Sequence, residues 1–469
     1  MAEPIAVLVE DDPEQSEFSS NILSELGFDV RAFGCIADAL DYLKENTELI
    51  DLFVLDRRLP VNPGELVSDE FGDELLRTVR SRFTDARIIV FTGFATISHV
   101  QQSLEGSGQL PTQDRPAIDR VTVLEKSQSI EFKEQASAFR GLVQSFDNIE
   151  VKTTDTACTL SYREKRAIRR LAYEYRADSA SVTPLSGGLT GDPIWLCNLS
   201  RAEGLFATLV AKRLRTLPVR GGLMELLPRV NTAATLSTLS GMMGGTYLTL
   251  LQLAGKDAFP LMRLIESNPD EAVRIARPLW AALHGIANDE KVLPVAQICT
   301  PLIAWERLTE LLKPYGISIP PGTLTATVKM GLRHGDFHPL NVLVDGEHAV
   351  LIDYDGPVIA SGVLDPLTMM VSTLVHPASP IRADKWPAPS EIGTSFGELE
   401  FGAGHAQAAW FHGVTSWFQQ CRTSDREGWA MMLAKAGRQL EYPNVTCDAE
   451  IVGRVIAIAR RAASALAET

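Results

Sequence analysis

The feature that most constrains the fold of this chain is the pattern of residues 1–146, in which short apolar runs alternate with segments of helical spacing. The run at 5–9 is apolar throughout and has the length of a buried strand. Strands that alternate with helices predict βαβ units and a parallel sheet that is covered on both faces. The expected strands are residues 5–9, 29–33, 52–55, 87–91 and 121–124. The expected helices are residues 14–26, 36–46, 70–83, 97–104 and 130–146.

Polar residues follow four of these expected strands, at the edge where the carboxyl ends of parallel strands meet and ligands bind. These residues are Glu10, Asp11 and Asp12, then Asp56, Thr92 and Lys126. Carboxylates brought this close together repel one another unless a divalent cation lies between them, and oxygen ligands that leave room for water suit Mg²⁺. Lys126 and Thr92 supply a cation and a hydroxyl group for a transferred phosphoryl group.

The order of these groups along the chain resembles the response-regulator receiver family. The resemblance implies a flavodoxin-like α/β fold with a five-stranded parallel sheet, and a sensor histidine kinase as the phosphodonor. It implies that Asp56 accepts the phosphoryl group and that Glu10 and Asp11, with Asp56, bind Mg²⁺. It also implies that Thr92 and Lys126 contact the phosphoryl group.

The resemblance covers about residues 4–146, with departures at three places. Ser127 stands where the family usually has a proline, and Val123 occupies the aromatic switch position. An insertion, VNPGELVSD, follows Pro60. The departures leave the chemical groups in place, but they change the positions through which this family usually converts phosphorylation into a change of surface.

The second candidate site is the segment LRHGDFHPLNVLV at 332–344, which is followed by VLIDYDGP. Phosphoryl transfer needs a carboxylate near the acceptor hydroxyl and oxygen ligands for metal ions. Asp336 and Asn341 fall on one expected loop, and Asp353 follows a short apolar strand. Two short strands flank the turn DGEH, and this hairpin would carry Asn341 and Asp353 toward one metal site.

The pattern HGDxHxxN resembles the aminoglycoside phosphotransferase and choline kinase group, which shares the protein-kinase fold. The resemblance implies ATP as co-substrate, Asp336 as catalytic base, and Asn341 and Asp353 as Mg²⁺ ligands. It also implies that His334 and His338 shape the loop, although each of them alone is more often a structural residue.

The same resemblance implies a nucleotide-binding lobe upstream of the catalytic loop. Its candidate residues are Gly187 and Gly188 in a glycine-rich turn, Lys212 at the end of a strand, Glu225 as the partner of that lysine, and Gln252 and Leu253 as a hinge. Glycines in such a turn let backbone N–H groups approach phosphates. Asp365 lies where this group often has an aspartate that braces the catalytic loop, and it fits a helix N-cap equally well.

The second part of the chain is therefore expected to be an α+β protein-kinase-like domain with a helical C-terminal region. Residues 147–159 are polar and rich in turn formers, which predicts a linker. Residues 270–315 and those after about 365 are expected to be mostly helical. The expected parts are a receiver at 1–146, the linker at 147–159, a nucleotide lobe at 160–260 and a catalytic lobe at 261–469.

Charge and composition exclude several classes of protein. The formal net charge of −15 argues against a nucleic-acid-binding protein, which normally presents a basic face. The densest basic stretch, SYREKRAIRRLAYEYR at 161–176, is interpreted as one solvated helix face. Without a run of about 18 apolar residues, membrane insertion is not expected. Scattered cysteines and the lack of a leader pattern indicate a cytoplasmic protein.

Two functions remain open for the second part. In the first, a response regulator controls ATP-dependent transfer of a phosphoryl group to a hydroxyl of an aminoglycoside, choline, a sugar, a nucleoside or a protein. In the second, a kinase-like module binds nucleotide or a partner protein without transfer. The presence of Lys212, Asp336, Asn341 and Asp353 together favours the enzyme. A transcription factor is disfavoured by the acidic charge and by the lack of a helix-turn-helix pattern.

Overall fold

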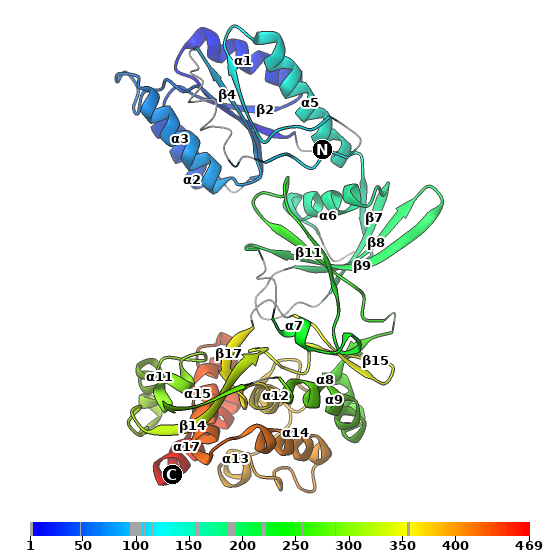
Figure 1. Ribbon diagram of the computed structural model, residues 1–469, viewed down its shortest axis with the longest axis vertical. Helices are drawn as coiled ribbons and strands as arrows, with labels where there is room; N and C mark the ends of the chain where they lie inside the picture. The colour runs from blue at the N-terminus through cyan, green and yellow to red at the C-terminus, as the bar shows by residue number, and fades with distance from the viewer. Residues whose placement is uncertain are drawn as a thin grey trace. The chain divides into compact units, whose positions relative to one another are not determined.

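The computed structural model describes residues 3–46, 48–93, 106, 108–113, 116–154, 159–185, 193–217, 222–255, 257–286, 288–353 and 357–469. The chain forms two compact units, which Figure 1 traces with a colour that runs along the sequence. Unit 1 is Met1–Leu217 with Thr235–Gln252, and unit 2 is Pro218–Ala234 with Leu253–Thr469. The helix expected at 97–104 lies outside the described residues.

Unit 1 begins with a five-stranded parallel sheet in the order β2-β1-β3-β4-β5, which is the flavodoxin-like order. Its strands are β1 (Ile5–Val9), β2 (Asp29–Phe33), β3 (Ile50–Leu55), β4 (Arg87–Thr92) and β5 (Val121–Glu125). The helices described around it are α1 (Pro13–Glu25), α2 (Ile36–Glu45), α3 (Asp69–Arg82) and α5 (Ser129–Asp147). The five-stranded parallel sheet predicted from the sequence is confirmed.

This first sheet is buried on both faces, because successive side chains of a strand point to opposite faces and both sets are apolar. On β1, Ala6 and Leu8 belong to a core shared with α1 and α5. Val7 and Val9 belong to a second core shared with α2 and α3. In Figure 1 the two pairs of helices lie on opposite sides of the strands. All five strands therefore bring their carboxyl ends to one edge.

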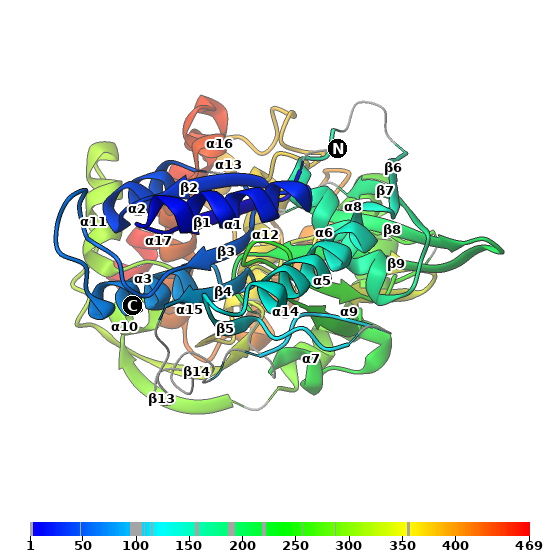
Figure 2. The same ribbon diagram turned by 90° about the horizontal axis from the view of Figure 1, so that it is seen from above.

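Unit 1 continues into a six-stranded sheet in the order β10-β11-β9-β8-β7-β6, and Figure 2 labels β6, β7, β8 and β9 next to one another. Its strands are β6 (Glu150–Thr153), β7 (Ser179–Leu185), β8 (Ile194–Arg201), β9 (Gly204–Leu214), β10 (Thr235–Leu239) and β11 (Tyr247–Leu251). β6 lies within 147–159, where we expected a linker. It pairs in parallel with β7, and Val151 packs against the core of unit 1, so tertiary pairing makes a strand of this polar segment.

One hydrophobic core extends from the first sheet into the second, and helix α6 (Tyr162–Glu174) lies at their junction. Arg166 of α6 donates a hydrogen bond of 2.7 Å to Asp51 of β3, with side chains that are 0% and 3% exposed. It also donates to the Tyr162 hydroxyl over 2.6 Å. The interpretation of 161–176 as a solvated helix face is therefore wrong for Arg166 and Arg170, which are buried. The buried partner of Arg166 is distant in sequence, so no local pattern reveals it.

We expect Arg166→Met to destabilise unit 1 by about 3–5 kcal/mol, because it leaves the Asp51 carboxylate buried without its partner. The double variant Asp51→Leu/Arg166→Met should recover most of this loss, because apolar groups then replace both charges. Denaturant unfolding of the full chain measures both effects. Lys165→Met, on the exposed side of the same helix, is the matched control. If Arg166→Met unfolds at the same denaturant concentration as the wild type, the buried pair has no such role.

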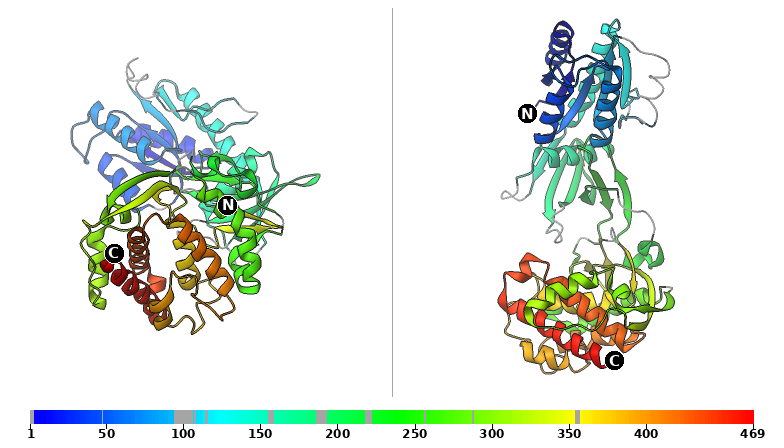
Figure 3. Two further views of the ribbon diagram at one scale, coloured as in Figure 1. Left: turned by 60° about the horizontal axis from the view of Figure 1, so that its bottom comes forward. Right: turned by 90° about the vertical axis from the view of Figure 1, so that its left-hand side faces the viewer.

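Unit 2 contains two three-stranded sheets, in the orders β12-β15-β16 and β13-β14-β17. Its strands are β12 (Phe259–Pro260), β13 (Asn288–Pro294), β14 (Thr325–Arg333), β15 (Val342–Asp345), β16 (His348–Leu351) and β17 (Val358–Ser361). Its helices are α7 (Leu223–Leu226), α8 (Leu261–Ser267), α9 (Pro269–His284), α10 (Val295–Cys299), α11 (Trp305–Leu312), α12 (Leu364–Val375), α13 (Pro389–Ser395), α14 (Ala408–Cys421), α15 (Asp425–Gln439), α16 (Pro443–Thr446) and α17 (Ala449–Glu468). The C-terminal helices α15 and α17 lie side by side (Figure 3).

Two local expectations for unit 2 are met, the second with one exception. The hairpin around the turn DGEH is present, with β15 antiparallel to β16. The segment 270–315 is mostly helical, as expected, in α9, α10 and α11, but it also contains strand β13, which pairs with β14. The sequence of β13, NDEKVLP, has no apolar alternation of its own, so its conformation follows from pairing with β14. Among the described residues, no helix is long and apolar enough to cross a membrane.

Candidate functional site

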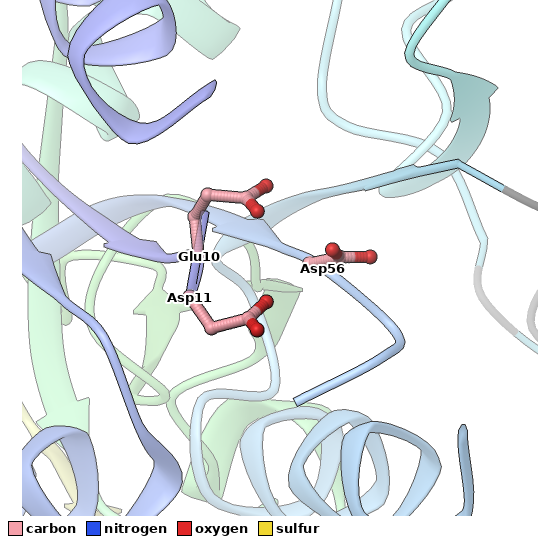
Figure 4. A group of neighbouring side chains, drawn as sticks. All are labelled: Glu10, Asp11 and Asp56. Carbon is pink, nitrogen blue, oxygen red and sulfur yellow. The ribbon is translucent and has the colours of Figure 1, made fainter. Parts of the chain in front are cut away.

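Three carboxylates converge at the carboxyl edge of the first sheet, as Figure 4 shows. Glu10 and Asp11 follow β1, and Asp56 follows β3. Each side chain offers one oxygen, and these oxygens lie within 4.8 Å of one another. Glu10 and Asp56 are buried, and Asp11 is the most exposed of the three. Their convergence follows from the fold, because parallel neighbouring strands end at the same edge.

Lys126 approaches this cluster from the loop after β5. Its Nζ lies 2.8 Å from Glu10 Oε1 and 2.8 Å from Asp56 Oδ2. Its backbone N–H donates to the Thr92 carbonyl oxygen over 2.9 Å, which holds the ends of β4 and β5 together. Thr92 is buried at the end of β4. The five residues to which the resemblance assigns a role therefore lie at this edge, and Asp12, the sixth residue expected there, caps helix α1.

One ammonium group faces three carboxylates, and the pKa values reflect the deficit of positive charge. Burial raises the pKa of Glu10 to about 7, against the lowering effect of its hydrogen bond from Lys126. Burial also raises the pKa of Asp11. Burial alone would lower the pKa of Lys126, but hydrogen bonds to Asp56 and Glu10 raise it. A further cation at this edge would favour ionisation of both acids.

The loop after Asp56 is held by hydrogen bonds and by close packing. Asp56 Oδ1 accepts from the backbone N–H groups of Arg57, at 2.6 Å, and Arg58, at 3.3 Å. Arg57 in turn pairs with Asp73 of α3 over 3.0 Å. Gly72 permits this approach of α3, because a Cβ atom there would lie 1.9 Å from the Arg57 carbonyl oxygen. The Asp56 carboxylate is thus fixed by backbone donors.

The strands and loops that form this edge match a known family of domains. Residues 6–109 match the response regulator receiver domain family. The N-terminal part of this chain is a receiver domain. A receiver domain implies a histidine kinase as the source of its phosphoryl group. The matched residues include Glu10, Asp11, Asp56 and Thr92, and they end before Lys126.

The receiver domain is also similar to solved structures. The receiver domain of the Francisella response regulator 1452 shares 18% identity, with 30% of this chain and 98% of that chain covered and a TM-score of 0.23. A CheY-like receiver domain protein from Methanospirillum hungatei shares 18% identity, with 30% and 99% covered and a TM-score of 0.22. At this identity and TM-score, these likenesses add nothing to the family match. No curated protein matches the chain by sequence.

The catalytic-loop candidates lie together in unit 2, between β14 and β15. Asp365 of α12 is buried, and its oxygens accept from the backbone N–H groups of His334 and Gly335, both at 3.2 Å. The His334 Nε2 donates to the Ile352 carbonyl oxygen over 3.1 Å, and its Nδ1 accepts from the Asp336 backbone N–H over 3.3 Å. Asp365 and His334 therefore brace the backbone before Asp336.

The Asp336 carboxylate is exposed for 67% of its side chain and lies 3.5 Å from the Nε2 of buried His338. Partial desolvation of this carboxyl group by the atoms around it acts to raise its pKa. The hydrogen bond from His338, with the charges of His338, Lys435 and His334, lowers the pKa to about 2. Asp336 is therefore an ionised carboxylate at neutral pH.

The two expected metal ligands of this site are held on neighbouring backbone. Asn341 Nδ2 donates to the Asp336 carbonyl oxygen over 2.9 Å. The Ile352 N–H donates to the Asn341 carbonyl oxygen over 2.9 Å, which brings the residue before Asp353 beside the loop. Asp353 has a left-handed backbone, with φ of 65°. A non-glycine residue in this conformation is uncommon and marks a turn or a functional position.

The candidates for nucleotide binding are divided between the units. Lys212 lies buried in β9 of unit 1, opposite Thr249 of β11. Gln252 directly follows β11 in unit 1, and Leu253 begins the next segment of unit 2. Glu225 lies on the four-residue helix α7 of unit 2. Gly187 and Gly188 lie outside the described residues.

Two residues near Asp336 were not predicted from the sequence. Lys435 of α15 is 7% exposed, and burial lowers its pKa to about 8, while Asp336 and Asp365 act to raise it. The His376 ring lies 5.3 Å from that of His338, and burial and the His338 charge lower its pKa to about 4. No sequence motif marks either residue. Lys435 lies in α15 and His376 directly follows α12, and both helices come after the loop in the sequence, where they are recognisable only as buried helical segments.

Proposed function

We propose that this protein is a two-component response regulator in which Asp56 accepts a phosphoryl group from a sensor histidine kinase. The observation that carries the proposal is the cluster of Glu10, Asp11 and Asp56, with Lys126 bonded to two of its members. Lys126 and the Thr92 hydroxyl would contact the transferred group. Hydrogen bonds from a cation to phosphoryl oxygens are among the strongest in proteins.

The residues at this edge fit Mg²⁺. Three carboxylates with converging oxygens provide hard ligands and an excess of negative charge, and Mg²⁺ prefers such ligands while retaining water. Glu10, Asp11 and Asp56 would hold the ion, which would offset the charge of the incoming phosphoryl group.

In this proposal, the second part of the chain transfers a phosphoryl group from ATP to a hydroxyl group. Asp336 would act as the base, Asn341 and Asp353 would hold Mg²⁺, and Lys212 would contact the nucleotide phosphates. The braced loop supports this assignment, since Asp336 is ionised, exposed and preceded by backbone that Asp365 holds. Such fixed geometry is what phosphoryl transfer requires from the protein.

The charged groups around Asp336 indicate which class of hydroxyl compound would accept the phosphoryl group. Lys435, His338 and His376 lie around the carboxylate, so the site holds cationic and hydrogen-bonding nitrogen groups in addition to its base. A cationic acceptor such as an aminoglycoside or choline would be repelled by the Lys435 ammonium. We therefore favour a neutral or anionic hydroxyl compound, or a protein hydroxyl, as acceptor.

The alternative is a module that binds nucleotide or a partner protein without transfer. The observation that favours it is the short α7, since Glu225 lies on a single helical turn, whereas kinases place this glutamate on a longer helix. In this alternative, the proposed phosphoryl transfer to Asp56 is the same.

Calorimetry with Mg-ATP on the full chain tests the second part of the proposal. We expect the wild type to bind Mg-ATP and Asp353→Asn to weaken binding about tenfold or more, because it removes a charged metal ligand. Glu347→Gln, in the exposed turn of the same hairpin, should bind as the wild type does. If the wild type does not bind millimolar Mg-ATP, both the enzyme and the nucleotide-binding module are excluded.

A further inference from the structure

Unit 1 contains a cavity of about 410 Å³ where the receiver domain meets the β10–β11 turn. Thr84 and Asp85 line it from the receiver side, before β4 begins, and residues 238–241 and 245–247 line it from the hairpin. Its size is in the range of small-molecule sites, about 300–1,000 Å³. Because it lies at the amino ends of the receiver strands, it is at the opposite edge of the sheet from Asp56.

Two arginines in the wall of this cavity have N–H groups that find no acceptor in the part of the chain that the structure describes. Arg120 donates from Nε and Nη2 to carbonyl oxygens of Arg80, Phe83 and Ala86 at 2.8–3.3 Å. Its Nη1 has no hydrogen-bond partner among the described residues. Burial lowers the pKa of Arg120, which remains charged at neutral pH.

Arg170 of α6 is the second of these arginines, and it is only 4% exposed. Its Nη1 donates to Glu174 over 2.7 Å, but its buried Nε has no hydrogen-bond partner within the described part of the chain. A buried donor without an acceptor costs free energy, commonly about 1–3 kcal/mol. The Arg170 side chain also lines the cavity, so its positive charge would attract an anionic ligand there.

Among the described residues that line the cavity, the one carboxylate is already engaged. Asp85 accepts from the backbone N–H groups of Met243 at 2.7 Å and Gly245 at 2.8 Å, and so fastens the turn to the receiver domain. Gly244 and Gly245 are left-handed, with φ of 70° and 72°. A Cβ atom on Gly244 would lie 2.8 Å from a Leu49 methyl group, so glycine is needed for this close approach.

We infer that this cavity binds a small phosphorylated molecule between the receiver domain and the β10–β11 hairpin. Guanidinium groups match phosphate oxygens in geometry and charge, and the hydroxyl groups of Thr84 and Ser240 add further donors to the same cavity. A ligand there would join the receiver domain to β11, which pairs directly with the strand that carries Lys212. The inference does not depend on phosphoryl transfer by unit 2.

The experiment uses inorganic phosphate as the probe. Phosphate is titrated into the full chain, and the hydrogen-exchange rates of the backbone amides at 238–247 are measured. We expect phosphate to slow exchange in this segment of the wild type. Ser240→Asp places a carboxylate at an exposed position of the cavity wall and should weaken this effect at least tenfold without removing any buried group. Arg170→Met should weaken it similarly, and Lys165→Met, which removes an exposed charge from the same helix, should not.

Two outcomes would overturn the inference. Unchanged exchange at 238–247 in the presence of phosphate would mean that the cavity holds only water. Slowed exchange that Ser240→Asp and Lys165→Met show equally would mean that phosphate acts from another site on the chain. Because Ser240 is exposed, the Ser240→Asp result stands even if Arg170→Met fails to fold.

Discussion

Asp56→Asn will take up no phosphoryl group from acetyl phosphate and Mg²⁺, whereas the wild type will take up one. The amide lacks the charged oxygen that attacks phosphorus, and no other carboxylate in the cluster has the position of Asp56 between Lys126 and the backbone donors of Arg57 and Arg58. Mass spectrometry of the intact protein measures the added group. The effect is all or none, so it is the largest expected of any single substitution in the chain.

Two further variants test whether labelling depends on Asp56 itself and on the proposed metal ligands. Asp41→Asn, on the exposed side of α2, removes an equal charge and should be labelled like the wild type. Glu10→Gln combined with Asp11→Asn should abolish labelling, since both proposed metal ligands are then neutral while Asp56 remains. Equal labelling of Asp56→Asn and the wild type would place the phosphoryl group on another residue.

Asp336→Asn will lower the rate of phosphoryl transfer by roughly two to four decades, the usual range for loss of a general base. It should leave Mg-ATP affinity almost unchanged, because the nucleotide is assigned to Lys212 and to the metal ligands Asn341 and Asp353. Steady-state transfer to a panel of neutral and anionic hydroxyl compounds, together with calorimetry, separates the two effects.

The pH dependence of transfer gives a second measure of Asp336. Since its pKa is lowered to about 2, the carboxylate is ionised at every pH above about 4, and the transfer rate should show no loss from its protonation between pH 5 and 8. Asp289→Asn, an exposed carboxylate on β13, should transfer at the wild-type rate. If the wild type and Asp336→Asn both show no transfer above the rate without protein, the module without transfer replaces the enzyme.

The receiver domain could be predicted almost completely from the sequence. The expected strand at 29–33 coincides with β2, and the strand at 52–55 lies within β3, because each is bounded by polar or turn-forming residues. The edge site was also predictable, since parallel strands end together and the polar residues directly follow them. The start of α1 is also determined locally, because the Asp12 side chain accepts hydrogen bonds from the backbone N–H groups of Glu14 and Gln15.

The hairpin and loop of unit 2 were predictable for the same reason, because the pattern from His334 to Asp353 lies within one short segment of chain. Strand β13 was not, since its sequence lacks periodicity and its partner β14 follows only after two helices. The positions of Lys435 and His376 near Asp336 were likewise hidden, because each depends on how a later helix packs against the loop.

The sequence by itself determined which segments of the receiver domain become strands and which polar groups meet at the strand ends, because those features depend on spacing along the chain. Only the tertiary structure decided that Arg166 is buried against Asp51, that β6 joins the second sheet, and that Arg120, Arg170 and the β10–β11 turn enclose one cavity. The physical reason is that a buried charge is stable only beside a compensating group. Such a partner can come from any part of the chain, so its identity depends on packing.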